Sequence, residues 1–142
     1  MIFFDADIIG PWVAERVGIK RYIPGTASAI GRIKDGRIVA GVLYQDYNGA
    51  NVSAHIAGEG QNWLNKKFLS IIFDYPFNQL KVNRITGYVV STNKAAQNLD
   101  EKLGFKREAI LRDAHPDGDL IIYAMHKDEC RWLKDLPYER FK

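Results

Sequence analysis

The segment NKAAQNLDEKLGF, residues 93–105, decides the fold of this chain. Asn93 is a residue type that accepts hydrogen bonds from the free N–H groups of a first helical turn, and Gly104 tolerates the left-handed conformation in which many helices end. Alanine and leucine residues between them recur at helical spacing. The segment therefore predicts a helix up to residue 103, followed at Phe105 by a strand.

Strand-forming sequences lie on both sides of this helix. Residues 84–91 predict a buried strand before it. Residues 105–112 and 120–126 predict a final pair of strands, joined through Pro116-Asp117-Gly118, a sequence that suits a turn. A short amphipathic segment at residues 130–133 follows.

Two turn signals and a long amphipathic stretch organise the middle of the chain. Asp35-Gly36 and Asn48-Gly49 tolerate positive φ and favour tight hairpins, so three antiparallel strands are expected around them. From Asn62 the apolar residues recur about every 3.6 positions, which predicts a helix. Because Pro76 cannot continue a regular helix, the expected range is residues 62–75. The three strands are expected over residues 29–34, 37–45 and 51–57.

The N-terminal residues complete the order. Residues 2–4 predict a short strand. Gly10-Pro11 is expected to begin a helix that Gly18 ends, because proline favours the first helical position and glycine the position just beyond the last. Residues 19–26 are expected to form a loop. The order β-α-β-β-β-α-β-α-β-β predicts an α/β fold with a mixed, mostly antiparallel central sheet and helices on both faces.

Composition indicates one domain over residues 1–142. A chain of this length that is 46% hydrophobic can form one packed core but not two ordinary domains. Cys130 is the only cysteine, so an intrachain disulfide is excluded and a reducing compartment, the cytoplasm, is expected. We expect no membrane association, because no apolar stretch approaches the roughly 20 residues that span a bilayer. We expect no metal site, because the acids lack a metal-ligand spacing.

The segment 93–105 also resembles a motif of the GNAT acyltransferase superfamily, N-x-x-A-x-x-x-Y-x-K-L-G-F. Asn93, Ala96 and the run from Lys102 to Phe105 match it, and the element order resembles the GNAT fold over nearly the whole chain. The resemblance implies an acyl-CoA-dependent N-acetyltransferase. It would use acetyl-CoA as co-substrate and an amine of a small molecule or a protein as acceptor.

In that family, the strands that correspond to residues 52–57 and 84–91 part, and the pantetheine arm of acyl-CoA pairs with their exposed backbone. An opened sheet offers unpaired donors and acceptors to such an amide-bearing ligand. By resemblance, residues 55–57 border one side of the slot and residues 88–90 the other. The residues implied for cofactor binding are Ile56, Ala57, Gly58, Gly60, Gln61, Asn62, Val89, Asn93 and Ala96.

The sequence AGEGQNW, residues 57–63, departs from the family's pyrophosphate loop, Q/R-x-x-G-x-G/A. Its two glycines still allow the backbone to curl around an anion at a helix N-terminus. Glu59 would lie unfavourably near phosphate oxygens unless its side chain points outward. The alternative is a glycine turn that only starts the long helix.

Asp100 is a second departure, because it replaces the tyrosine that often protonates the departing CoA thiolate in the family. A carboxylate that is ionised at neutral pH is a poor proton donor unless burial raises its pKa. Asp100 is therefore either a catalytic acid in a buried setting or a solvated helix residue. In the second case, water would relay the proton.

His55 is the candidate general base, because histidine changes protonation near neutral pH and strand alternation places it on one face with Ser53 and Ala57. The alternative is a structural histidine. Ser91 and Asn93 are expected to hydrogen-bond the pantetheine or the substrate, with helix capping as the competing role. Four aromatic residues either form an acceptor cleft or fill the core, namely Tyr22, Tyr44, Tyr47 and Trp63.

Three functions are consistent with these features. The first is the N-acetyltransferase. The second is DNA-base modification, because the chain looks like small GNAT-like proteins of bacteriophages; the net charge of +3 is compatible with nucleic acid, but the basic residues do not cluster. The third is a non-catalytic GNAT-shaped binding or assembly module whose apolar strand edges pair two copies into a homodimer.

Overall fold

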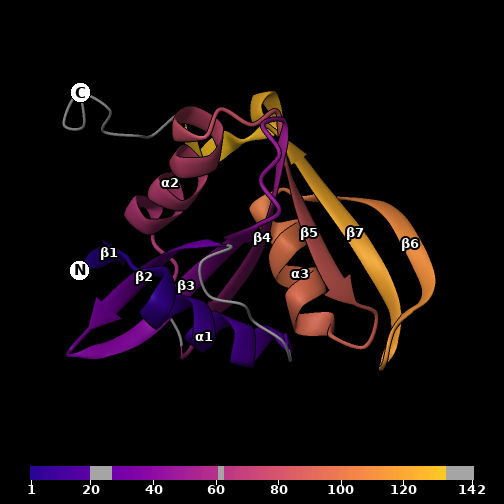
Figure 1. Ribbon diagram of the computed structural model, residues 1–142, viewed down its shortest axis with the longest axis horizontal. Coiled ribbons are helices and arrows are strands. Elements are labelled where there is room, and N and C mark those ends of the chain that lie inside the picture. The colour runs from indigo at the N-terminus through magenta and orange to yellow at the C-terminus, as the bar shows by residue number, and fades with distance from the viewer. Residues whose placement is uncertain (20–26, 61–62, 134–142) are drawn as a thin grey trace.

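The computed structural model describes residues 1–19, 27–60 and 63–133. These residues form one seven-stranded sheet in the order β1-β2-β3-β4-β5-β7-β6 (Figure 1). Within them, β4 and β5 run parallel and every other neighbouring pair is antiparallel. The strands are β1 Ile2–Phe4, β2 Ser28–Lys34, β3 Arg37–Gln45, β4 Asn51–Gly58, β5 Arg84–Val90, β6 Lys106–His115 and β7 Gly118–His126.

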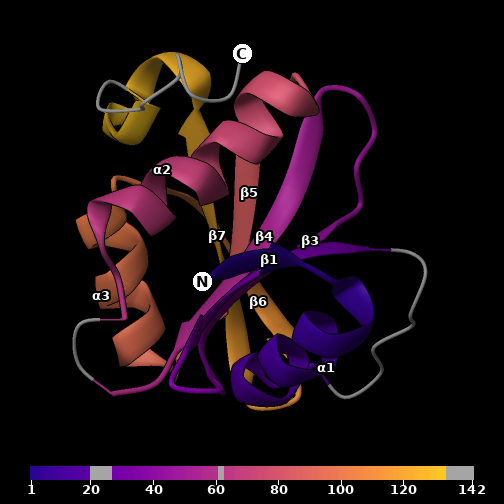
Figure 2. The same cartoon turned by 90° about the vertical axis from the view of Figure 1, so that its left-hand side faces the viewer.

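Helices cover both faces of this sheet (Figure 2). Helix α1, Ala6–Val17, packs on β2, β3 and β4, whereas α2, Lys66–Asp74, and α3, Lys94–Leu103, lie on the opposite face. The predicted element order and the mixed, mostly antiparallel sheet are confirmed. Short helical turns follow α2, over Tyr75–Gln79, and β7, over Lys127–Glu129 and Arg131–Leu133.

Two apolar clusters hold the layers together. The larger one joins the sheet to α2 and α3 and contains the fully buried Phe68 and Phe77. The smaller one packs Ile9 and Val13 of α1 against Leu43 of β3. Alternate residues of β3 and β4 therefore face different clusters, as expected for strands that are covered on both sides.

The first hairpin forms as predicted, and the second has a longer turn. Asp35 and Gly36 adopt φ of 54° and 77°, the positive values that a tight two-residue hairpin requires. In the second hairpin, β3 ends at Gln45, and Oδ1 of Asn48 accepts hydrogen bonds from the N–H groups of Ala50 and Asn51. The asparagine side chain thus organises a wider loop in place of a two-residue turn.

The prediction that Gly10-Pro11 begins α1 is wrong. The helix begins at Ala6, because the side chain of Asp5 caps it by accepting hydrogen bonds from the N–H groups of Asp7 and Ile8. Pro11 therefore lies inside the helix, where it cannot donate to the carbonyl four residues earlier. The cap and the burial of the apolar face of α1 outweigh this loss. Gly18 ends the helix at φ 81°, as predicted.

The predicted start of α2 is wrong, whereas its end at Asp74 lies within one residue of the prediction. The helix begins at Lys66, because the side chain of Asn65 caps it by accepting a hydrogen bond from the N–H of Phe68 at 2.8 Å. Pro76 does not end the helical path, which continues as a π-helical turn to Gln79. The carbonyl of Ile72, four residues before Pro76, accepts a hydrogen bond from the Tyr44 hydroxyl in place of the N–H that proline lacks. Within the described ranges, no helix combines the length and the apolar character needed to cross a bilayer.

Candidate active site

The two middle strands part, as the family resemblance implies. β4 and β5 pair at three positions, Asn51 with Arg84, Val52 with Ile85 and Ser53 with Thr86. Beyond them β4 keeps its outer partner β3 as far as Gly58, and β5 keeps β7 as far as Val90. Within the described chain, the inner edges of both strands therefore carry main-chain groups without a strand partner. Figure 1 shows the two strands diverging below their junction.

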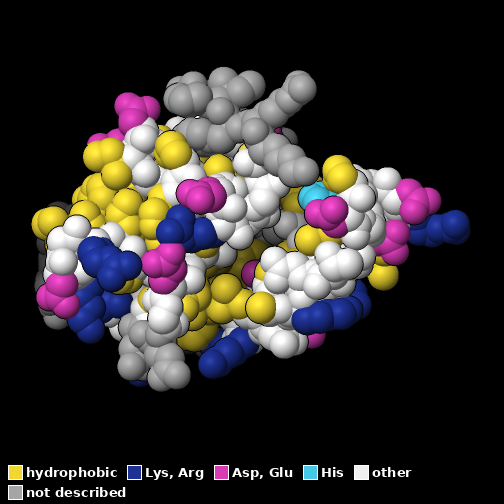
Figure 3. All heavy atoms as spheres, turned by 90° about the horizontal axis from the view of Figure 1, so that it is seen from below, with side chains coloured by type: hydrophobic (Ala, Val, Ile, Leu, Met, Phe, Trp, Pro, Cys, Tyr) yellow, Lys and Arg dark blue, Asp and Glu magenta, His cyan; other side chains and the backbone are white. Residues whose placement is uncertain are grey.

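A small cavity of about 50 Å³ lies in this opening. Figure 3 shows the molecule from the side toward which the strands diverge, with a hollow near the centre lined by hydrophobic side chains. Eight of the residues that the sequence analysis placed at the slot line this cavity. Its lining consists of Val17, Ala54, His55, Ile56, Tyr88, Val89, Val90, Asn93, Ala96 and Asp100.

His55 lies on the α1 side of the cavity. It pairs in β4 with Leu43 of β3, whose side chain packs against α1. Burial lowers the pKa of the His55 imidazole below its usual 6.5, and the negative charge of Asp46 opposes part of this effect. His55 is therefore neutral near pH 7, with one ring nitrogen free to accept a proton.

Asp100 enters the cavity from α3. Burial, with a smaller contribution from the charge of Glu101, raises the pKa of the Asp100 carboxyl from 3.8 to about 7. Within the part of the chain that the structure describes, its side chain makes no hydrogen bond or ion pair. The carboxyl is therefore not the solvated group of the alternative interpretation: near neutral pH a large fraction of it carries a proton.

A glycine in β5 makes room for this carboxyl. A Cβ atom at Gly87 would lie 3.2 Å from Oδ2 of Asp100, closer than most side-chain contacts allow. A glycine inside a strand is a recognised signal of such close approach, so Gly87 is a site residue that the sequence analysis missed although the signal was present. Val17 and Ala54 were also missed. The packing of α1 on β4 brings Val17 to the cavity, and Ala54 borders it because β4 loses its pairing with β5 after Ser53.

The residue next to Asp100 is held by a polar network beneath α3. The hydroxyl of Tyr123 in β7 donates to Oε2 of Glu101 at 2.7 Å, and Arg107 in β6 contacts both groups. Arg107 also donates to Oε1 of Gln97 at 3.2 Å. These bonds fix α3 on the sheet and keep the charge of Glu101 close to Asp100.

Asn93 and Ser91 have different roles. Asn93 caps α3, with Oδ1 accepting from the N–H of Ala96 at 3.0 Å, and it also lines the cavity. The hydroxyl of Ser91 accepts from the N–H of Asp119 at 3.0 Å, and its carbonyl accepts from Nε2 of Gln97. Ser91 therefore anchors the start of β7 and does not line the cavity.

The end of β4 and the segment after it pack against the indole of Trp63. Gly58 lies under the indole, where an added Cβ would fall 1.9 Å from Cδ2 of Trp63, and Nη1 of Arg32 donates to the Trp63 carbonyl. Glu59 points to α1, where Nε of Arg16 donates to its carboxylate at 2.8 Å. The acid is therefore paired with a cation of α1. Gly60 has φ of 73°.

Three proposed cofactor residues remain. One is packed in the core, and two lie outside the residues that the structure describes. Ala57 is buried against the α1 cluster and does not line the cavity. Gln61 and Asn62 lie outside the described residues.

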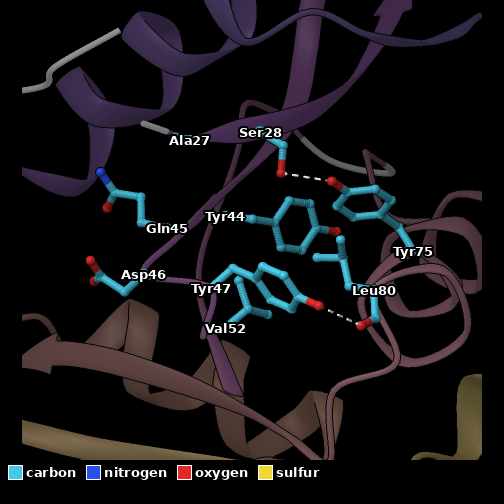
Figure 4. A pocket seen from close by; sticks show the side chains of 9 residues that line it. All are labelled: Ala27, Ser28, Tyr44, Gln45, Asp46, Tyr47, Val52, Tyr75 and Leu80. Carbon is cyan, nitrogen blue, oxygen red and sulfur yellow. Dashed lines mark hydrogen bonds between the residues drawn. The ribbon is translucent and has the colours of Figure 1, made fainter. Parts of the chain in front are cut away.

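The tyrosines form a second cavity of about 210 Å³, shown in Figure 4. Tyr44 and Tyr47 line it as part of the expected aromatic group, together with Tyr75 from the π-helical turn. The Tyr44 hydroxyl donates to the carbonyl of Ile72 at 2.5 Å, and the Tyr47 hydroxyl donates to the carbonyl of Leu80 at 3.1 Å. The Tyr75 hydroxyl donates to Oγ of Ser28 at 3.0 Å. Trp63 does not join this cluster, and Tyr22 lies outside the described residues.

Comparison with solved structures identifies the fold. Mutant forms of the spermidine/spermine N-acetyltransferase SpeG from Vibrio cholerae are 12% identical over 90% of this chain and 96% of that chain, with a TM-score of 0.70. Another SpeG mutant from Vibrio cholerae is 13% identical over 98% and 99%, with a TM-score of 0.68. A GNAT-family acetyltransferase from Bacillus anthracis is 16% identical over 80% and 74%, with a TM-score of 0.61.

These similarities establish that the chain has the fold of GNAT acetyltransferases, so the fold implied by the 93–105 segment is confirmed. No protein-family model and no curated protein sequence matches the chain. Structural similarity at such low identity defines the fold alone.

Proposed function

We propose that this protein is an acyl-CoA-dependent N-acetyltransferase that moves an acetyl group from acetyl-CoA to an amine. The observation that carries the proposal is the parting of β4 and β5 beyond Ser53 and Thr86, beside a cavity that contains both His55 and Asp100. Because each strand keeps its outer partner, the free inner edges offer donors and acceptors to the amides of a pantetheine arm.

Acetyl-CoA would supply a thioester whose carbonyl carbon is open to attack by an amine. The N–C bond forms and the C–S bond breaks, while the amine loses a proton and the departing sulfur gains one. The protein must therefore provide a base, an acid and donors for the developing oxyanion. Inner-edge N–H groups of β4 are suited to the last of these roles.

His55 is suited to be the base. Its neutral ring can take the proton of the attacking amine, because burial holds the pKa of the imidazole below 6.5. The nearby charge of Asp46 favours the imidazolium that forms. With the base on the α1 side, the acceptor amine would approach the thioester from that side of the slot.

Asp100 is suited to be the acid, in the position of the family's tyrosine. Its carboxyl has a pKa of about 7 and faces the cavity from α3, opposite the face that carries His55. A protonated Asp100 can transfer its proton to the departing sulfur. The two groups therefore divide the proton transfers between the two faces of the slot.

The segment after β4 supports binding of the nucleotide end of acetyl-CoA. The negative charge of Glu59 is paired with Arg16, and Lys66 and Lys67 are exposed in the first turn of α2. Positive charge and the helix N-terminus thus begin six residues after Gly60. The roles of Gln61 and Asn62 stay predictions.

The test has two stages. Isothermal titration with acetyl-CoA and with CoA should detect binding of both, and the absence of binding at millimolar ligand would reject the proposal. Release of free thiol should then be measured with a panel of amines, beginning with spermidine because that polyamine is in the names of the SpeG neighbours. Binding without turnover of any amine would favour the non-catalytic module. Mass analysis of nucleosides from co-expressed DNA tests the base-modification alternative.

A further inference from the structure

A separate cavity of about 450 Å³ lies between the β2–β3 hairpin and the segment after β4. Its lining combines four charged side chains with apolar residues and a glycine, namely Lys34, Asp35, Arg37, Ile38, Val39, Glu59 and Gly60. The main chain ties its two sides together, because the N–H of Glu59 donates to the carbonyl of Val39 at 2.9 Å. The hairpin and the segment after β4 therefore lie side by side along this space.

The charge available to a ligand in this cavity is positive. Lys34 and Arg37 are exposed and form no ion pair within the described residues. Of the two acids, Glu59 is already neutralised by Arg16, so Asp35 at the turn is the remaining negative group. Seen from below in Figure 3, Lys and Arg side chains gather with acidic ones at the left, toward the β2–β3 hairpin.

The position of this cavity relates it to the proposed acyl-CoA slot. β4 leads directly from Ile56, which lines the slot, to Gly58, two residues before Gly60. A ligand whose thioester end lies between β4 and β5, and whose chain follows β4, would bring its nucleotide end to Gly60. The adjacent cations would then face the most highly charged part of that ligand.

We propose that Lys34 and Arg37 bind the phosphate monoester on the ribose of acyl-CoA, an inference that rests on the proposed function. A phosphate monoester carries close to two negative charges at neutral pH, more than either phosphate of a pyrophosphate diester. A planar guanidinium can donate two parallel hydrogen bonds to it, and an ammonium adds a point charge. The hairpin cations thereby supplement a glycine segment that has only part of the family's pattern.

The test compares acetyl-CoA with 3′-dephospho-acetyl-CoA by titration calorimetry, using the full chain and the variant Lys34→Gln with Arg37→Gln. The wild-type protein is expected to bind acetyl-CoA about tenfold more tightly than the dephosphorylated ligand, since a charge-assisted contact contributes about one factor of ten. The double variant should lose this preference while its affinity for 3′-dephospho-acetyl-CoA stays the same. Arg112→Gln, an exposed arginine of β6 outside this cavity, is the matched control.

The outcomes separate this inference from the proposed function. Equal affinity of the wild-type protein for both ligands, or equal weakening of both in the double variant, would overturn the phosphate site and leave the acetyltransferase proposal standing. Failure of the wild-type protein to bind either ligand would overturn both. Far-ultraviolet circular dichroism should show that the double variant is folded, because both substituted side chains are exposed beside the hairpin turn.

Discussion

Asp100 shows how one residue changes its chemistry with its surroundings. In the sequence it replaces an expected tyrosine, and in the structure it is a largely buried carboxyl whose pKa is about 7. Replacing it with asparagine removes the transferable proton but keeps the shape. We expect kcat to fall by about 100-fold with little change in KM for acetyl-CoA, as for loss of a general acid.

The pH profile provides the readout for that substitution. Wild-type activity that depends on protonated Asp100 should decline as pH rises through about 7, and the Asp100→Asn variant should lack this decline. Asn98→Ala, at an exposed position of α3, is the control and should keep the wild-type profile. An unchanged kcat in Asp100→Asn would show that Asp100 is not the general acid and has only a structural role.

The same carboxyl should make stability depend on pH. Because its pKa is higher in the folded state, about 7, than the ordinary 3.8, its stabilising contribution is complete below the lower value and is lost as pH rises through 7. After allowance for partial exposure, we expect the free energy of unfolding to fall by about 2 kcal/mol from pH 5 to pH 8 on account of this group. Urea unfolding at both pH values should show a smaller fall for Asp100→Asn.

His55 should control the acidic side of the profile. The variant His55→Gln is expected to have a kcat/KM about 100-fold lower than the wild type, because the attacking amine loses its general base. The remaining activity should no longer fall as pH decreases below 6.5, the range in which the wild-type imidazole becomes charged. His126→Gln is the control, since that histidine lies at the end of β7 and does not line the slot. Equal losses in both variants would argue against a specific role for His55.

At the scale of elements, the decisive feature is the junction of β4 and β5. Hydrogen exchange followed by mass spectrometry should show that amides of residues 54–58 and 87–90 on the inner edges gain protection when acetyl-CoA binds, because the ligand replaces the missing strand partner. Residues 51–53 are already paired with β5 and should not change. Protection confined to other segments would place the ligand elsewhere.

Local sequence patterns predict the two ends of α3 correctly. Asn93 and Gly104 define α3 because capping and helix termination depend on local backbone chemistry. Pro11 misled the prediction of where α1 begins, and Pro76 gave no indication of the π-helical turn after α2, for the opposite reason. The tertiary burial of Ile9, Val13 and Phe77 keeps the chain helical around prolines that a local rule treats as boundaries.

At the scale of the whole molecule, the slot connects the two halves of the sheet, so a ligand bound there contacts both. Such a ligand binds the folded protein and not the unfolded chain. At a concentration of 100 times its Kd, acetyl-CoA should stabilise the protein by about 2.7 kcal/mol. For a chain of this size, that corresponds to a rise in Tm of roughly 5–10 °C by differential scanning fluorimetry. A Tm independent of acetyl-CoA concentration would contradict the proposed site.

The sequence by itself determined the order of elements, the turn at Asp35-Gly36 and the caps of α3, because these depend on interactions between residues close together in the chain. It also indicated eight of the residues that line the slot, through a resemblance carried by residues 93–105 and by the element order. Whether Asp100 is solvated or buried, and where Glu59 points, was decided only by the tertiary structure. A pKa or an ion pair depends on which distant segments remove water and bring charge, as β5 does for Asp100 and α1 for Glu59.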